Sequence, residues 1–320
     1  MANPEPLAPF VDAFALGDGE QTIVNICTVL ENAKKEGLSR QKKIELLSEI
    51  PGLYVPSLVQ MEKAGKYIVP LDGQRSVAAA KIDSLGKENY PERPLVPLIE
   101  VVHSRLAVEV MRGCTRGCRF CSAGINYRPV RERNIRDIKE QICCGIDSTG
   151  WRDVGLLSLS TADYSSFSRL LTELREIKHR KNISFGLPST RIDALSEQQL
   201  ELYESVTSTS SITIAPEAGS MRLRKVINKD FTDEMIFETV ERLMKRNVQT
   251  LKLYFMVGLP TETMEDIDAI VKMVSVISDM VRKRSRRRVV HVAISPFSPK
   301  AHTPFGREPM ASVETLLQRS

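Results

Sequence analysis

The sequence predicts an α/β fold built on a mostly parallel sheet. From Arg105 onward, short β-branched or apolar runs alternate with longer amphipathic runs, which is typical of repeated βα units. The strand-like runs recur at intervals of roughly thirty residues, and the segments between them have the spacing of helices packed on a sheet. Such strands either close a barrel or form an open doubly wound sheet, and periodicity does not choose between the two.

The first hundred residues differ from the rest. Residues 23–36 and 40–48 have helical spacing, and an irregular, Pro-rich region that includes 91–97 follows them. Proline and glycine interrupt helices and strands. We therefore expect a small N-terminal appendage over residues 1–97.

The main domain is expected over residues 98–310, where strands follow one another at regular intervals. Each candidate is a short run of β-branched or apolar residues. In chain order the candidates are 106–110, 154–159, 183–187, 212–214, 251–257 and 289–294.

Helix start signals stand between these strands. Asn134 and Thr232 occupy N-cap positions, and Ser196 has a Gln three residues later, as in a capping box. The helix that begins at Thr263 has the most regular apolar stripe. After the last strand, residues 311–320 begin a further helical pattern, which we interpret as the start of a truncated C-terminal element.

The composition is that of an ordinary globular chain. Its 320 residues are 42% hydrophobic and 27% charged, enough for one substantial core. The 45 basic and 40 acidic residues leave a net charge of +5, too small to indicate nucleic-acid binding. No run approaches the roughly 18 apolar residues of a membrane span, and the N-terminus lacks a signal peptide. We expect a cytoplasmic protein with no membrane partner.

Three of the six cysteines lie together after the first strand. Cys114, Cys118 and Cys121 have the spacing Cys-x3-Cys-x2-Cys. In a reducing compartment, clustered cysteines favour metal or catalytic chemistry over disulfides. A [4Fe–4S] cube held by three cysteines leaves one iron open, whereas structural zinc takes four ligands. The alternative is a zinc knuckle completed by His103 or Cys144.

Other polar residues follow the same ends of the predicted strands. Ser158 and Ser160 end the second strand, and Glu217 follows the fourth. Arg191 and Asp193, after the third, either face the site or form a structural ion pair. Ligands bind at the C-terminal ends of parallel strands, so the sequence predicts an active site at this edge.

The cysteine spacing, with Phe120 directly before the last cysteine, resembles the signature of the radical S-adenosylmethionine (SAM) superfamily. The resemblance extends from near Arg105 to Phe305. It implies a partial (β/α)6 TIM-type barrel, and so chooses the barrel over the open sheet. It also implies a [4Fe–4S] cluster on the three cysteines. The open iron of that cluster would chelate S-adenosylmethionine, and one electron would cleave the sulfonium to a 5′-deoxyadenosyl radical.

The same resemblance assigns cofactor-binding positions. Phe120 would lie beside the adenine, and Gly258, in the strand-five motif, would let the backbone approach it. Ser158 and Ser160 stand where many members carry Gly-Gly-Glu for the methionine amino group, so hydroxyls or carbonyls would substitute. Glu217, within Ile-Ala-Pro-Glu-Ala-Gly-Ser, matches the acidic residue that contacts the cofactor. No catalytic residue is assigned.

Further runs, among them Ala-Pro-Glu-Ala-Gly and Leu-Tyr-Phe-Met-Val-Gly-Leu-Pro-Thr-Glu-Thr, resemble uncharacterised radical SAM proteins with an upstream cobalamin-binding-type domain. Residues 3–20 match the end of that domain, and the sequence has no Asp-x-His-x-x-Gly cobalamin signature. Cobalamin is therefore expected only in a full-length form. Either the chain is truncated at both ends or it is a natural short form.

The predicted function is that of a radical SAM enzyme of unknown substrate, with methyl transfer, methylthio transfer and radical rearrangement as candidate reactions. The resemblance implies an electron donor such as flavodoxin or ferredoxin. The alternative is a non-catalytic iron–sulfur protein or inactive fragment that keeps the cluster for structure or electron transfer. The basic run 282–288 could contact RNA, but its place opposite the cluster favours a solvated helix end.

Overall fold

The computed structural model describes residues 4–65, 67–71, 76–187, 195–207 and 210–319. The chain forms two compact units, Met1–Leu85 and Gly86–Ser320, so the Pro-rich stretch 91–97 groups with the second unit. Within the described residues, no helix is long and apolar enough to cross a membrane.

The first unit contains the two helices predicted near the N-terminus. Its core is small, with Leu47, Ile50 and Leu53 buried together. The elements are η1 (Glu5–Leu7), β1 (Phe14–Ala15), α1 (Glu20–Lys35), α2 (Arg40–Ser48), β2 (Leu53–Tyr54), η2 (Pro56–Leu58), β3 (Met61–Ala64) and β4 (Tyr67–Pro70). β1 pairs with β2 and β3 with β4, both antiparallel.

The second unit has the predicted α/β architecture. All six predicted strands are present, in two parallel three-stranded sheets. The first sheet contains β5 (Leu106–Glu109), β8 (Asp153–Leu157) and β9 (Ser184–Gly186); the second contains β10 (Ser211–Glu217), β11 (Thr250–Val257) and β12 (Val289–Pro296). One isolated parallel bridge pairs Phe185 with Thr207. The arrangement is the predicted partial barrel, and its strand pairing in the described part of the chain does not close into a ring.

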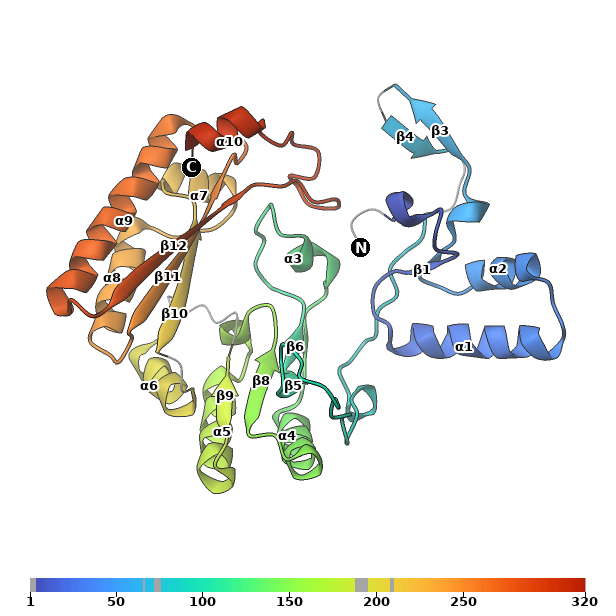
Figure 1. Cartoon of the computed structure of the whole chain (residues 1–320), viewed down its shortest axis with the longest axis horizontal. Helices are drawn as coiled ribbons and strands as arrows, with labels where there is room; N and C mark the ends of the chain where they lie inside the picture. Colours follow the sequence, from blue (N-terminus) through green and yellow to red (C-terminus); the bar gives the residue numbers. More distant parts are fainter. Residues whose placement is uncertain (1–3, 66, 72–75, 188–194, 208–209, 320) are drawn as a thin grey trace. The chain divides into compact units, whose positions relative to one another are not determined.

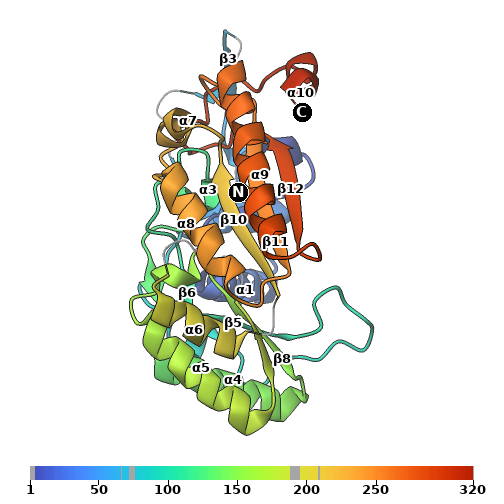
Figure 2. The same cartoon turned by 90° about the vertical axis from the view of Figure 1, so that its left-hand side faces the viewer.

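Helices accompany both sheets (Figure 1). The first sheet has α4 (Ile135–Thr149), α5 (Phe167–Lys181) and α6 (Glu197–Val206); the second has α7 (Met221–Val226), α8 (Asp233–Met244) and α9 (Met264–Arg284). Figure 2 shows α8 and α9 side by side near β10 and β11. The remaining elements are η3 (Lys87–Asn89), β6 (Met111–Arg112), α3 (Ser122–Asn126), β7 (Arg131–Glu132), η4 (Thr161–Asp163) and α10 (Val313–Arg319).

The predicted helix starts are confirmed in atomic detail. The Asn134 side chain caps α4 by accepting a backbone N–H at 2.8 Å, and Thr232 caps α8 in the same way at 3.2 Å. Ser196 forms the expected capping box of α6, and Thr263 forms another at α9. Because these side chains satisfy the free N–H groups of the first turn, they fix where each helix begins.

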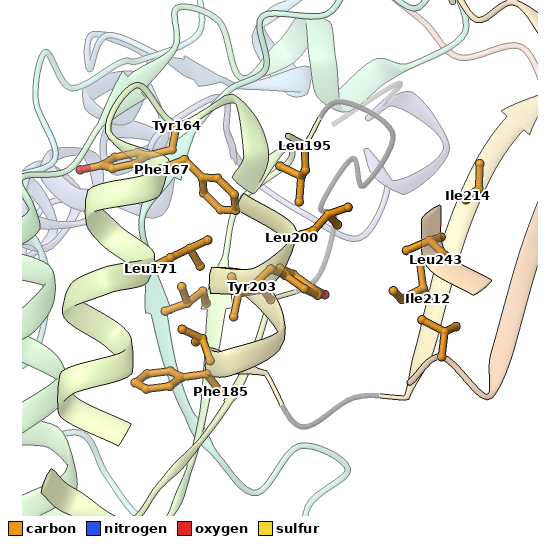
Figure 3. Packing of buried hydrophobic residues seen from close by; sticks show 14 of the residues in the cluster. Tyr164, Phe167, Leu171, Phe185, Leu195, Leu200, Tyr203, Ile212, Ile214 and Leu243 are labelled. Atoms are coloured by element: carbon orange, nitrogen blue, oxygen red, sulfur yellow. The ribbon is translucent and has the colours of Figure 1, made fainter. Parts of the chain in front are cut away.

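A single apolar core runs through both sheets of the second unit. Residues of β5, β8, β9, β10 and β11 belong to one cluster of buried side chains. Figure 3 shows one region of it, in which Tyr164, Phe167, Phe185 and Tyr203 pack near the first sheet and Ile212 lies on β10. Burial of each such side chain stabilises the fold by roughly 1.5–3 kcal/mol. Side-chain packing therefore joins the two sheets.

Candidate functional site

The cysteine loop begins after β6 and ends where α3 begins. At its start, Gly113 has φ +90°, and a Cβ there would lie 2.6 Å from the carbonyl oxygen of Tyr127. Only glycine adopts this backbone without strain or collision. The turn into the loop therefore depends on the glycine that precedes the first cysteine.

The three thiols of the loop are free and half-buried. Cys121 is the N-cap of α3, and its Sγ accepts a hydrogen bond from Gly124 N at 3.3 Å. Cys114 Sγ accepts from Arg116 N at 3.4 Å. Backbone N–H groups thus already face two of the three sulfurs.

Cys118 lies in a region of several charged groups. Burial raises the pKa of its thiol, the Lys229 ammonium lowers that pKa, and negative charge on Cys121, Cys114 and Glu217 raises it again. Lys229 Nζ lies 3.0 Å from Glu217 Oε1, and the two side chains are 13% and 17% exposed. The structure therefore brings Glu217 and a lysine close to the cysteine loop.

The end of β10 has an irregular backbone at Glu217. The register with β11 shifts between Ile214 and Glu217. Glu217 itself has φ +66°, in the left-handed region that non-glycine residues rarely adopt. Such irregularities redirect a side chain at the end of a strand, and here the redirected carboxylate pairs with Lys229.

One side of the cysteine loop is attached to the segment after β8. Arg116 Nε donates to Asp163 Oδ2 at 2.9 Å, and a second guanidinium nitrogen contacts Asp163 Oδ1. Thr115 Oγ1 also donates to Asp163, at 3.4 Å. A bidentate arginine–carboxylate pair is among the stronger and more directional contacts in proteins.

The other side of the loop is attached to the turn after α7. Arg119 N donates to Ile227 O at 3.0 Å, and Asn228 Nδ2 donates to Gly117 O at 2.8 Å. Phe305 N, from the segment after β12, donates to Arg119 O at 3.2 Å. The loop therefore has contacts with both halves of the barrel.

The two serines after β8 have hydrogen-bond partners within the chain. Ser158 Oγ lies 2.7 Å from Thr161 Oγ1. Ser160 is 2% exposed, and its hydroxyl donates to Asp163 Oδ2 at 2.7 Å. In this structure the Ser160 hydroxyl therefore supports the carboxylate that holds the cysteine loop.

Phe120 and Gly258 both lie beside apolar side chains. Phe120 packs against a small buried cluster at the C-terminal strand ends that includes Met256 and Phe297. Gly258 directly follows β11 and has φ +79°, and its N–H donates to Glu262 Oε1 at 2.8 Å. The positive φ favours glycine at this position, and a Cβ there would also lie 2.9 Å from a methyl carbon of Leu316.

The arginines near the cysteines take part in specific contacts rather than forming a free positive patch. Both the Nε and a terminal nitrogen of Arg112 donate to Glu109, at 2.9 and 2.8 Å. Arg119 donates to the carbonyl of Val226 at 2.5 Å. Lys229, which sequence reasoning missed, is the cation that acts on Cys118.

Within the described residues, no three His, Cys, Asp or Glu side chains converge as a metal site. The loop thiols would have to reorient to meet at one centre. Their chemistry nevertheless fits an iron–sulfur cluster, because three free thiols lie on one short, anchored loop. Neither His103, whose Nδ1 lies 3.3 Å from Arg105, nor the exposed Cys144 joins such a group.

The basic run 282–288 spans the end of α9 and the approach to β12. Arg288 donates to the carbonyls of Met244 and Arg246 at 2.6 and 2.8 Å. The run precedes β12, so it lies at the sheet edge opposite the C-terminal strand ends. Arg191 and Asp193 lie outside the described residues.

Sequence reasoning also missed Asp163. A signal was present, because Asp163 follows the second predicted strand within the run Leu-Ser-Leu-Ser-Thr-Ala-Asp-Tyr. Lys229 gave a weaker signal, since it follows Glu217 by a full helix and turn. In both cases the partner is distant in sequence.

Comparison with known proteins gives consistent matches. Residues 108–274 match the family model of the radical SAM superfamily, and residues 1–56 match a model for the N-terminal part of radical SAM proteins. An uncharacterized protein of Methanocaldococcus jannaschii is 34% identical over 198 residues, which are 62% of this chain and 41% of that protein.

Two further proteins are more distant. The ribosomal protein uS12 methylthiotransferase of Thermosipho africanus is 24% identical over 280 residues, 81% of this chain and 65% of that protein. The radical SAM methyltransferase TsrM of Kitasatospora setae, solved with cobalamin and a [4Fe–4S] cluster, has a TM-score of 0.60 at 14% identity. That match covers 95% of this chain and 55% of TsrM, and it shows a shared fold. The chain spans less than two thirds of each of these proteins.

Proposed function

The chain belongs to the radical SAM superfamily, and we propose that it binds a [4Fe–4S] cluster through Cys114, Cys118 and Cys121 and cleaves S-adenosylmethionine reductively to a 5′-deoxyadenosyl radical. The observation that carries the proposal is the set of three free thiols on one loop at the C-terminal strand ends. Glu217 and Lys229 lie in the same region.

Each residue has a role that its chemistry allows. The cluster, when bound, supplies the electron that cleaves the sulfonium. The thiolates of Cys114, Cys118 and Cys121 would hold the cluster, and with only three protein ligands the cluster would keep a position open for S-adenosylmethionine. The Glu217 carboxylate can accept hydrogen bonds from a ribose diol or an ammonium group. Phe120 and the bare backbone of Gly258 offer apolar contact and close approach for the adenine.

Ser158 and Ser160 contribute around the methionine end of the cofactor. Ser158 is the more accessible of the two, because it is half-buried and shares a hydrogen bond with Thr161, whereas Ser160 is buried and its hydroxyl donates to Asp163. The core for this chemistry would be residues 98–310, which lie within the second unit. Flavodoxin or ferredoxin would deliver the electron. Methyl or methylthio transfer to an unidentified substrate would be the net reaction.

Anaerobic reconstitution with iron and sulfide, then dithionite and S-adenosylmethionine, tests the proposal. We expect a coloured cluster and formation of 5′-deoxyadenosine, and we expect Cys118→Ala to lose both. Cys144→Ala is the matched control, because Cys144 is an exposed cysteine outside the loop. A cluster that never cleaves the cofactor would favour the non-catalytic alternative, and a colourless protein with one bound zinc would contradict both.

A further inference from the structure

The Asp163 carboxylate collects several donors although it is far from the cysteines in sequence. Arg116 contacts both of its oxygens, Ser160 Oγ donates at 2.7 Å, and Thr115 Oγ1 donates at 3.4 Å. The Asp163 side chain is only 10% exposed. A carboxylate this well enclosed holds its partners more strongly than a surface ion pair does.

The position of these contacts in the loop is specific. Thr115 and Arg116 lie between Cys114 and Cys118, so the hydrogen bonds to Asp163 hold the loop segment between the first two proposed ligands. The contact from Arg119 N to Ile227 O, at 3.0 Å, acts on the interval between Cys118 and Cys121. The first interval is held from both halves of the barrel, because Asn228 Nδ2 also donates to Gly117 O at 2.8 Å, but Asp163 is the side chain that holds Thr115 and Arg116 directly after Cys114.

We propose that Asp163 is a positioning residue that holds the first part of the cysteine loop in place before the cluster is inserted. The proposal deepens the proposed function and rests on it for the identity of the metal group. Ordering a backbone costs roughly 1–2 kcal/mol per residue. A loop already ordered by Asp163 does not have to pay that cost when its thiols bind iron.

Asp163→Asn tests the proposal with little change in shape. The amide keeps one acceptor oxygen but turns two N–H donors toward a group of donors, so the fork with Arg116 is lost. Asp147→Asn is the matched control, because Asp147 also accepts two contacts from one cation, Lys181 Nζ at 2.8 and 3.0 Å, but is 60% exposed.

The first measurement uses the protein without a cluster and is independent of the proposed function. Trypsin cleaves after Arg116 only when the loop opens, and mass spectrometry identifies the new terminus at Gly117. We expect cleavage there to become roughly tenfold faster in Asp163→Asn, because loss of a charged hydrogen-bonded pair favours local opening, and to be unchanged in Asp147→Asn. Arg116→Lys keeps the cleavage site and the charge but loses the fork, and should give a smaller increase.

The second measurement is iron bound per chain after reconstitution. We expect Asp163→Asn to retain less iron than the wild type and Asp147→Asn to match it. The inference would be overturned if Asp163→Asn and Arg116→Lys were cleaved after residue 116 at the wild-type rate and bound as much iron as the wild type. If the wild type binds no cluster, the proposed function fails, whereas the cleavage comparison still decides whether Asp163 positions the loop. A thermal melt of each variant shows whether a change is confined to the loop.

Discussion

Arg224 should be essential for the stability of the second unit. Its side chain is fully buried, at 0% exposure. The guanidinium donates to the carbonyls of Phe231 and Gly219, both at 2.7 Å, and of Ala218 at 3.2 Å, and it contacts the Asp233 carboxylate. These bonds fix the corner that follows Glu217, so the perturbation of interest is Arg224→Met.

We expect Arg224→Met to lower the unfolding free energy by about 3–5 kcal/mol, because three carbonyl oxygens of buried residues lose their charged donor. Each bond from a charged donor is worth about 1.5–3 kcal/mol, but their full sum overestimates the loss because the variant no longer buries a guanidinium. The lost contact with Asp233 adds little to this decrease in stability, since the Asp233 side chain is 49% exposed and water can solvate it. Methionine keeps most of the apolar stem.

Urea unfolding followed by tryptophan fluorescence measures this loss. The chain has a single tryptophan, Trp151, which packs against the main core of the second unit. Lys225→Met is the control, because Lys225 is the next residue in the chain and is exposed. Its replacement should change the free energy of unfolding by less than about 0.5 kcal/mol. Arg224→Lys, which keeps the charge but not the planar donors, should fall between the two. A loss below about 1 kcal/mol in Arg224→Met would refute the reasoning, since it is less than a single charged hydrogen bond provides.

Two further predictions concern the same corner and use the same urea assay. Gly219→Ala should lower the free energy of unfolding by about 1–3 kcal/mol, because the new Cβ would lie 2.3 Å from Ile270 N. Gly150→Ala is the control: Gly150 has φ +75° but open space around it, so the loss should be only about 1 kcal/mol. Equal losses in the two variants would contradict a collision at Gly219. Burial acts to raise the pKa of Asp266, but hydrogen bonds, first from Ser220, lower that pKa overall. The carboxylate therefore stabilises the fold above its unfolded pKa of about 4 and loses this effect as the pH falls through the folded value. The stability difference between wild type and Asp266→Asn should accordingly shrink below about pH 4, whereas a difference independent of pH would count against the assignment.

The regular elements could be predicted because their signals are local. Short β-branched or apolar runs indicated all six strands of the two parallel sheets, and single side chains such as Asn134 and Thr263 marked the helix starts. The two-residue strands β6 and β7 were missed, since they are held by pairing with each other rather than by their own sequence. Periodicity also could not choose between a barrel and an open sheet, because both bury the same faces.

The candidate site was predictable to the extent that its residues are neighbours in sequence. The cysteine spacing needed no tertiary information, and Glu217 was placed by its motif at a strand end. Lys229 and Asp163 were not found, because the significance of each depends on a partner brought close by folding. The role of Arg116 likewise depends on folding, because its guanidinium contacts both carboxylate oxygens of Asp163.

The contacts of the cysteine loop give the cluster site a further physical consequence. Asp163 attaches the loop to the segment after β8, and Ile227 attaches it to the turn after α7. Among the described residues, an isolated bridge pairs Phe185 of β9 with Thr207, which follows α6 and precedes β10. The loop adds a further link between the halves of the barrel. A group that binds only the folded loop stabilises everything the loop connects. Insertion of a cluster should therefore stabilise the whole second unit, and a variant that releases either anchor should reduce that gain.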